Sequence, residues 1–111
     1  MYGYKAGIDL KTMVKSLQPG GGGSYSLNVL APRILERNFD PGFYVEHFVK
    51  DLGIVLHESE RMGIKMPGTE LSTNMYKIMM EQGGSKLGMH GLMTVLEKMY
   101  GFELDKYKWE K

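Results

Sequence analysis

The sequence contains no cysteine, and its 111 residues include only one tryptophan and four prolines. The absence of cysteine excludes a disulfide framework, a thiolate nucleophile and a zinc ribbon, and it is typical of a reducing compartment. The charges nearly cancel, because 14 lysines and arginines face 13 aspartates and glutamates, for a formal net charge of +1. We therefore expect no nucleic acid as a partner, since a phosphate backbone requires a clustered positive field.

Long apolar runs are also lacking, and none approaches the length that spans a bilayer. The N-terminal stretch Met1–Lys5 lacks the apolar segment of a signal peptide. We therefore expect a cytoplasmic protein with no membrane partner. Hydrophobic residues make up 42% of the chain and charged residues 24%, which is typical of a globular protein. The length predicts that residues 1–111 form a single domain.

Apolar residues recur at spacings of three and four, whereas the alternation of a strand never persists. The pattern predicts an all-α protein, a compact bundle of about five helices. The expected helices run from the N-cap Asp9 to Leu17, from Ser24 or Ser26 to Leu35 with a kink or break at Pro32, from Phe43 to about Met62, from Pro67 to Gly83, and from about Gly88 to Tyr100. The charged and aromatic tail, residues 102–111, is expected to fray.

The helix expected from Phe43 to Met62 has two contrasting faces at 100° per residue. Its core face comprises Val45, Phe48, Val49, Leu52, Val55 and Leu56. On the opposite face, Phe43, His47, Lys50 and Ile54 align at spacings of four, three and four. This second face is either a surface for a partner or a set of ordinary exposed apolar residues. In the next helix, Leu71, Met75, Ile78 and Met79 are expected to share one face.

Other motifs favour structural interpretations. The run Gly20–Gly23 before Ser24 lacks the Gly-Lys-Ser/Thr sequence and the preceding strand of a phosphate loop, so a flexible linker or a turn is favoured. The three histidines are far apart and none lies in a His-Glu-x-x-His motif, so we expect no metal site. The ten methionines are interpreted as core residues.

Three blocks, residues 38–43, 49–52 and 62–67, carry a resemblance to a known family. In their order and spacing, the chain resembles the C-terminal helical domain of the β-hydroxyacid dehydrogenases, which include 3-hydroxyisobutyrate dehydrogenase and tartronate semialdehyde reductase. The stretch Lys5–Asp9 resembles the end of the family's interdomain helix, and Gly23–Leu27 resembles its glycine-serine turn, so the glycine run becomes a native turn. The resemblance implies a fold like that of the 6-phosphogluconate dehydrogenase C-terminal domain.

The resemblance also implies a function. Family members move a hydride between NAD or NADP and a small 3-hydroxy acid. By position, Lys50 matches the lysine that approaches the cofactor, whereas Asp51 and Phe43 match residues near the substrate pocket. The family's catalytic lysine and its Rossmann domain have no match in this chain, so no residue is assigned as catalytic.

We therefore expect the chain alone to be inactive and to bind no cofactor. Its expected partners are the Rossmann domain of a parent enzyme, the hydroxy acid and further copies of itself. The alternative is a non-catalytic helical module that binds another protein.

Overall fold

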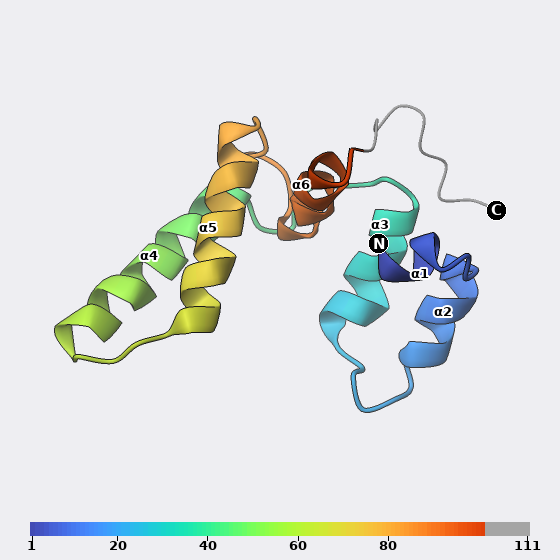
Figure 1. The fold of residues 1–111 in the computed structure, drawn as a ribbon, viewed down its shortest axis with the longest axis horizontal. Coiled ribbons are helices and arrows are strands. Elements are labelled where there is room, and N and C mark those ends of the chain that lie inside the picture. The colour runs from blue at the N-terminus through green and yellow to red at the C-terminus, as the bar shows by residue number, and fades with distance from the viewer. Residues whose placement is uncertain (102–111) are drawn as a thin grey trace. The chain divides into compact units, whose positions relative to one another are not determined.

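The computed structural model describes residues 1–101, and over that range it is all-α (Figure 1). The strand-like structure in this part of the chain is an isolated antiparallel bridge between Tyr44 and Gly88. The all-α class predicted from the sequence is therefore confirmed. The tail predicted to fray, residues 102–111, lies outside the described residues.

The described residues fall into two units, which are treated separately here. Unit 1 holds residues 1–39 and 96–101, and unit 2 holds residues 40–95. That residues 1–111 form a single domain stays a prediction. No helix among residues 1–101 is both long enough and apolar enough to cross a membrane.

Unit 1 contains α1 (Tyr2–Lys5), α2 (Leu10–Leu17), the π-helical turn η1 (Ser26–Leu30) and α3 (Ala31–Leu35). Helix α2 begins as predicted, because the Asp9 carboxylate accepts a hydrogen bond of 2.9 Å from the Thr12 amide. This bond and a second one from the Thr12 hydroxyl lower the pKa of Asp9, with the hydroxyl bond as the larger cause. Leu10 and Val14 are the buried residues of α2, whereas Leu17 at its end is 51% exposed.

The stretch predicted to be helical from Ser24 to Leu35 changes from π to α geometry just before Pro32. Ser24 Oγ accepts a hydrogen bond of 3.1 Å from the Leu27 amide and so caps the first segment. Proline has no amide hydrogen to donate to the carbonyl four residues earlier. The backbone widens into a π-helical turn just before it, where the Ala31 amide donates to the carbonyl of Ser26. The prediction that Pro32 disturbs the regular helix is met by this change from a π turn to the short α3, between Leu30 and Ala31.

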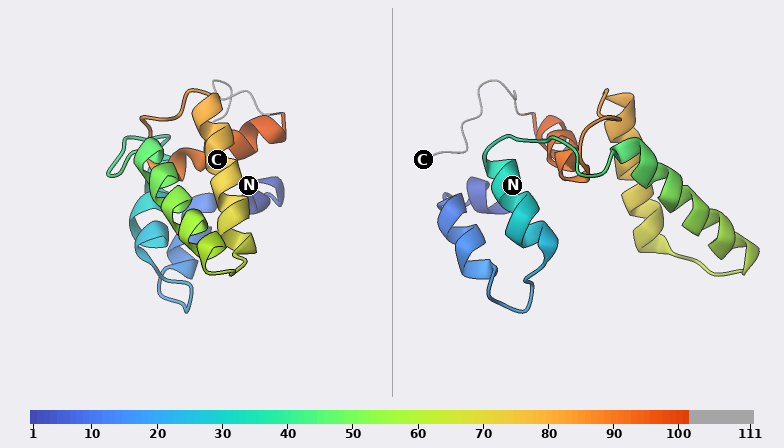
Figure 2. Two further views of the ribbon diagram at one scale, coloured as in Figure 1. Left: turned by 90° about the vertical axis from the view of Figure 1, so that its left-hand side faces the viewer. Right: turned by 180° about the vertical axis from the view of Figure 1, so that it is seen from behind.

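Unit 2 is built on α4 (Val45–Arg61) and α5 (Pro67–Glu81), which lie side by side in Figures 1 and 2. Gly63 ends α4 with a φ of +73°, as predicted for a helix C-terminus. The predicted start at Phe43 is wrong by two residues, because Tyr44 has extended backbone angles and pairs with Gly88. Unit 2 also contains the 3₁₀ turn η2 (Met89–Gly91), and α6 (Leu92–Met99) begins in unit 2 and ends in unit 1.

The core of unit 2 centres on four buried side chains, Val45, Tyr76, Met79 and Val95. The Tyr76 ring meets the Phe48 ring edge to face, with 4.9 Å between centroids. Phe48, Val49 and Leu52 of α4 also pack against this core, as the helical pattern predicted.

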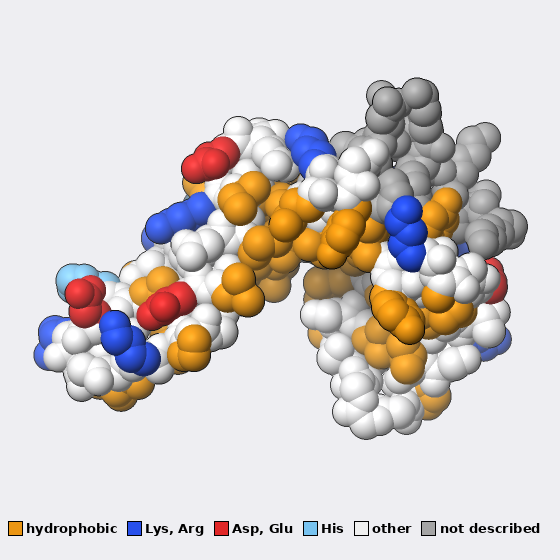
Figure 3. Space-filling model, viewed as in Figure 1, with side chains coloured by type: hydrophobic (Ala, Val, Ile, Leu, Met, Phe, Trp, Pro, Cys, Tyr) orange, Lys and Arg blue, Asp and Glu red, His pale blue; other side chains and the backbone are white. Residues whose placement is uncertain are grey.

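Two expectations for the core faces are wrong. The buried face of α5 comprises Thr73, Tyr76 and Met79, whereas Leu71 is 65% exposed and Ile78 is also exposed. The reason is that Tyr76 turns toward Phe48 and so directs the opposite side of α5 to solvent. On α4, Val55 is exposed rather than buried. Apolar side chains are interspersed with charged ones along both helices, as Figure 3 shows for one face.

Candidate cofactor and substrate face

The start of α4 is fixed by backbone hydrogen bonds to the segment from Ser85 to Gly88. The Val45 amide donates to the Leu87 carbonyl at 3.0 Å, and the Glu46 amide donates to the Ser85 carbonyl at 3.1 Å. These bonds satisfy two of the amides that the first turn of a helix leaves without an intrahelical acceptor. They also set the direction from which the chain enters α4, and hence the position of Phe43.

Side chains reinforce the same junction. Lys86 Nζ lies 2.5 Å from Glu46 Oε1 and 5.4 Å from the centre of the Tyr44 ring. The hydrogen bond from Lys86 lowers the pKa of Glu46, and the same bond raises the pKa of Lys86. Both groups are therefore charged at neutral pH. Lys86 was not predicted as a partner of Glu46, because the two residues are 40 positions apart and no local pattern relates them.

Gly88 is required by close packing at this junction. A Cβ atom at this position would lie 2.5 Å from Cε1 of His90 and 3.2 Å from the carbonyl oxygen of Asp40. His90 is itself buried. A side chain on residue 88 would therefore displace either the imidazole or the loop that leads to Phe43.

Phe43 lies just before α4, at the edge of a small aromatic cluster. Its ring centroid is 6.1 Å from that of His47 and 6.5 Å from that of Phe48. The His47 ring is also 5.7 Å from that of Tyr44. Phe43 nevertheless remains 43% exposed, so the cluster orients its ring without covering it. Such a ring can offer an apolar contact to a ligand.

Lys50 and Asp51 project from the second turn of α4 and form an ion pair. Nζ of Lys50 lies 3.0 Å from Oδ1 of Asp51, and the side chains are 63% and 49% exposed. The ammonium has three donors and the carboxylate has several acceptor sites, so the pair leaves both groups able to bind a ligand. Lys50 lies within α4 and Phe43 lies just before the helix begins, and both side chains are exposed. The exposed face predicted from the sequence is confirmed, whereas its ligands stay a prediction.

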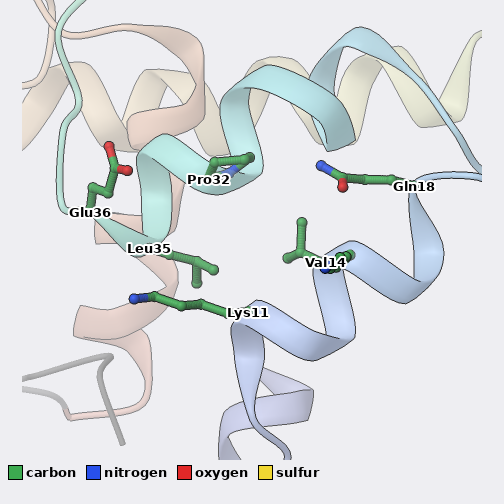
Figure 4. Close-up of a pocket in the computed structure, with 7 residues that line it drawn as sticks. Lys11, Val14, Gln18, Pro32, Leu35 and Glu36 are labelled. Carbon is green, nitrogen blue, oxygen red and sulfur yellow. The ribbon is translucent and has the colours of Figure 1, made fainter.

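A hollow of about 370 Å³ lies in unit 1, between α2 and the segment from Pro32 to Glu36 (Figure 4). Val14, Pro32 and Leu35 give it an apolar surface, and Lys11 and Glu36 lie toward one end. No motif in the sequence predicts this hollow, because its lining comes from two helices whose pairing no local pattern specifies. Within residues 1–101, no group of three histidine, aspartate or glutamate side chains could hold a metal ion.

Comparison with known protein families identifies the family of the chain. A family model described as the NAD-binding part of NADP-dependent 3-hydroxyisobutyrate dehydrogenase matches residues 1–96. The chain therefore belongs to the β-hydroxyacid dehydrogenase family.

Curated relatives support the same assignment. A probable 3-hydroxyisobutyrate dehydrogenase-like mitochondrial protein of Arabidopsis thaliana is 44% identical over 99 residues, which cover 89% of this chain and 30% of that protein. An uncharacterized oxidoreductase of Bacillus subtilis is 45% identical over 97 residues, covering 87% of this chain and 34% of that protein. The 2-hydroxy-3-oxopropionate reductase of Escherichia coli is 29% identical over 104 residues, covering 94% and 36%.

The chain thus spans about a third of the length of these relatives. The Arabidopsis and Escherichia coli relatives are named for a particular dehydrogenase or reductase, and the Bacillus subtilis relative is named only as an oxidoreductase. The cytoplasmic location predicted from the sequence stays a prediction, and the Arabidopsis relative is named as mitochondrial.

Proposed function

We propose that this chain is the helical domain of an NAD(P)-dependent oxidoreductase that acts on a small 3-hydroxy acid such as 3-hydroxyisobutyrate. In this proposal the chain completes the cleft for cofactor and substrate, and a Rossmann domain supplies the other side. The supporting observation is that Phe43, Lys50 and Asp51 stand exposed on one end of α4, in a chain whose family is named for this chemistry.

Lys50 is assigned to the cofactor. Its ammonium is a compact cation on a flexible stem, and such a group donates to phosphate, hydroxyl or amide oxygens. NAD or NADP supplies the hydride transfer when bound. Asp51 holds the ammonium at 3.0 Å, which limits the directions that Lys50 can take while leaving it largely exposed.

Phe43 and Asp51 are assigned to the substrate. The aromatic ring offers an apolar surface to the carbon skeleton of a hydroxy acid, and the carboxylate accepts a hydrogen bond from its hydroxyl group. Phe43 is positioned by the junction at Ser85–Gly88 and by the ring contacts with His47 and Phe48. No residue of this chain is assigned as catalytic, and we infer that the chain alone does not catalyse the reaction.

We also propose that the chain associates with copies of itself. Four large apolar side chains on α4, α5 and the loop between them are exposed, namely Ile54, Met62, Ile64 and Leu71. Contiguous apolar surface of a few hundred Å² is usually covered by association, and symmetric pairing is the commonest form.

The experiment that tests the oxidoreductase function is a chimera. The matching 97 residues of the Bacillus subtilis relative are replaced by those of this chain, and the purified chimera is assayed with NAD and NADP against a panel of 3-hydroxy acids. We expect cofactor-dependent oxidation of at least one acid. A folded chimera that is inactive on the whole panel, while the unaltered relative is active, would favour the alternative of a non-catalytic interaction module.

A further inference from the structure

Unit 1 contains a buried ion pair that the proposed function does not use. The two terminal guanidinium nitrogens of Arg37 donate to the carboxylate of Glu97: Nη1 to Oε1, and Nη2 to Oε2 at 3.1 Å. The Glu97 side chain is fully buried, at 0% exposure. The guanidinium of Arg37 also lies 5.0 Å from the centre of the Phe39 ring. The pair is therefore bidentate (two-pronged), and its carboxylate is shielded from water.

The backbone of Arg37 is unusual for a residue with a side chain. Its φ is +58°, in the left-handed region that favours glycine. It ends α3, with its amide bonded to the Ile34 carbonyl and the Asn38 amide bonded to the Arg33 carbonyl at 2.9 Å. Glycine is the usual residue in this turn. Arg37 therefore adopts a strained backbone conformation, which points to a specific role for its side chain.

The pair also lies at a distinctive place in the chain. The chain passes from unit 1 to unit 2 between Phe39 and Asp40, and it returns between Val95 and Leu96. Arg37 is the third residue before the first crossing, and Glu97 is the second residue after the second crossing. The ion pair therefore joins two parts of unit 1, the one just before the first crossing and the one just after the second crossing.

Net stability is a weak explanation for such a pair. The cost of removing two charges from water offsets most of their attraction, so apolar residues of similar volume often serve as well. A geometric role accounts better for both the strained turn and the two-pronged contact. Val95, one turn before the end of α6, is fully buried in the core of unit 2.

We propose that the Arg37–Glu97 pair is a conformational latch. It holds the last turn of α6, from Leu96 to Met99, against the end of α3. When the pair breaks, this turn opens as a local event while Val95 stays in the core of unit 2. Local opening of a few residues is common in proteins and requires less free energy than global unfolding. Amide hydrogen exchange measures such opening.

The test uses the 111-residue chain and a double variant, Arg37→Gly with Glu97→Met. Removing both partners avoids the uncompensated buried charge that either single change would leave, and glycine suits the positive φ. We expect amides of residues 96–99 to exchange at least about tenfold faster than in the wild type, and those of residues 48–52 in α4 to change by less than about twofold. The matched control is Glu58→Gln with Arg61→Gln, which removes an exposed pair on α4 and should leave residues 96–99 unchanged.

Two results would overturn the latch. One is unchanged exchange at residues 96–99 in the double variant. The other is an equal increase at residues 96–99 and 48–52, because a pair that only adds global stability would affect all amides alike. If the double variant does not fold, Arg37→Lys keeps the charge but loses the two-pronged contact. Faster exchange confined to residues 96–99 is again expected, and its absence would again refute the latch.

Discussion

Replacement of Lys50 by alanine separates a ligand-binding role from a structural one. In the wild type, the Lys50 ammonium pairs with Asp51 at 3.0 Å, but the two side chains are 63% and 49% exposed. Exposed ion pairs contribute only about 0–1 kcal/mol to the free energy of unfolding, because solvent screens them. Lys50 also lies away from the core residues of α4. We therefore expect Lys50→Ala to lower the midpoint of thermal unfolding by a few degrees at most.

The expected effect on function is larger. If Lys50 donates a charge-assisted hydrogen bond to the cofactor, its loss costs about 1.5–3 kcal/mol. This free energy corresponds to a roughly ten- to hundredfold decrease in kcat/KM or in cofactor affinity. The assay is steady-state kinetics of the active chimera with varied cofactor, combined with thermal unfolding of the same samples. The matched control is Lys77→Ala, an exposed lysine on α5 that should change neither quantity.

One pattern of results would refute the reasoning for Lys50. If Lys50→Ala strongly lowered the unfolding midpoint while kcat/KM per folded molecule stayed normal, Lys50 would be a structural residue. The proposed cofactor contact would then have to be abandoned.

Three further outcomes are expected. Calorimetric titration of the 111-residue chain with NAD or NADP should show no micromolar binding, because no phosphate-binding turn is recognised in it, and micromolar affinity for either would contradict this. Tyr76→Phe removes the hydrogen bond of 3.0 Å to the Met89 carbonyl and should cost about 1–3 kcal/mol in urea unfolding. Burial raises the pKa of Tyr76, so above about pH 10 this phenol ionises more readily in the unfolded chain than in the folded one. The free energy of unfolding of the wild type should therefore fall as the pH rises above about 10, and the part of this fall that is due to Tyr76 should be absent in Tyr76→Phe. Sedimentation velocity should give a mass above 12.6 kDa, whereas a constant 12.6 kDa up to high micromolar concentration would exclude self-association.

Local sequence signals predicted the helices well where one residue type determines the backbone. Asp9 caps α2, Gly63 ends α4 with a positive φ, and Pro32 lies in the first turn of α3, just after the π turn. Each of these effects depends on a side chain or its absence at one position. The exposed face of α4 was also predictable, because a regular helix of this length fixes which residues share a side.

Effects between segments were not predictable from periodicity. Leu71 is exposed and Thr73 is buried, because the orientation of α5 depends on the contact of Tyr76 with Phe48 in another helix. The Arg37–Glu97 pair joins residues 60 positions apart, and helical spacing carries no information about such a contact. For the candidate site, the resemblance proposes individual residues, which stay a prediction, whereas the junction at Ser85–Gly88 beside them required the structure.

The central claim is that a cofactor and a hydroxy acid bind over Phe43, Lys50 and Asp51. The most direct test is competitive labelling of lysines in the chimera with an amine-reactive reagent, read by mass spectrometry with and without NADP and 3-hydroxyisobutyrate. Lys50 is well exposed and should react readily when no ligand is present. We predict that the two ligands together slow the labelling of Lys50 several-fold and leave Lys77 unchanged. Equal labelling of Lys50 with and without ligands, in a chimera that binds them, would contradict the proposed site.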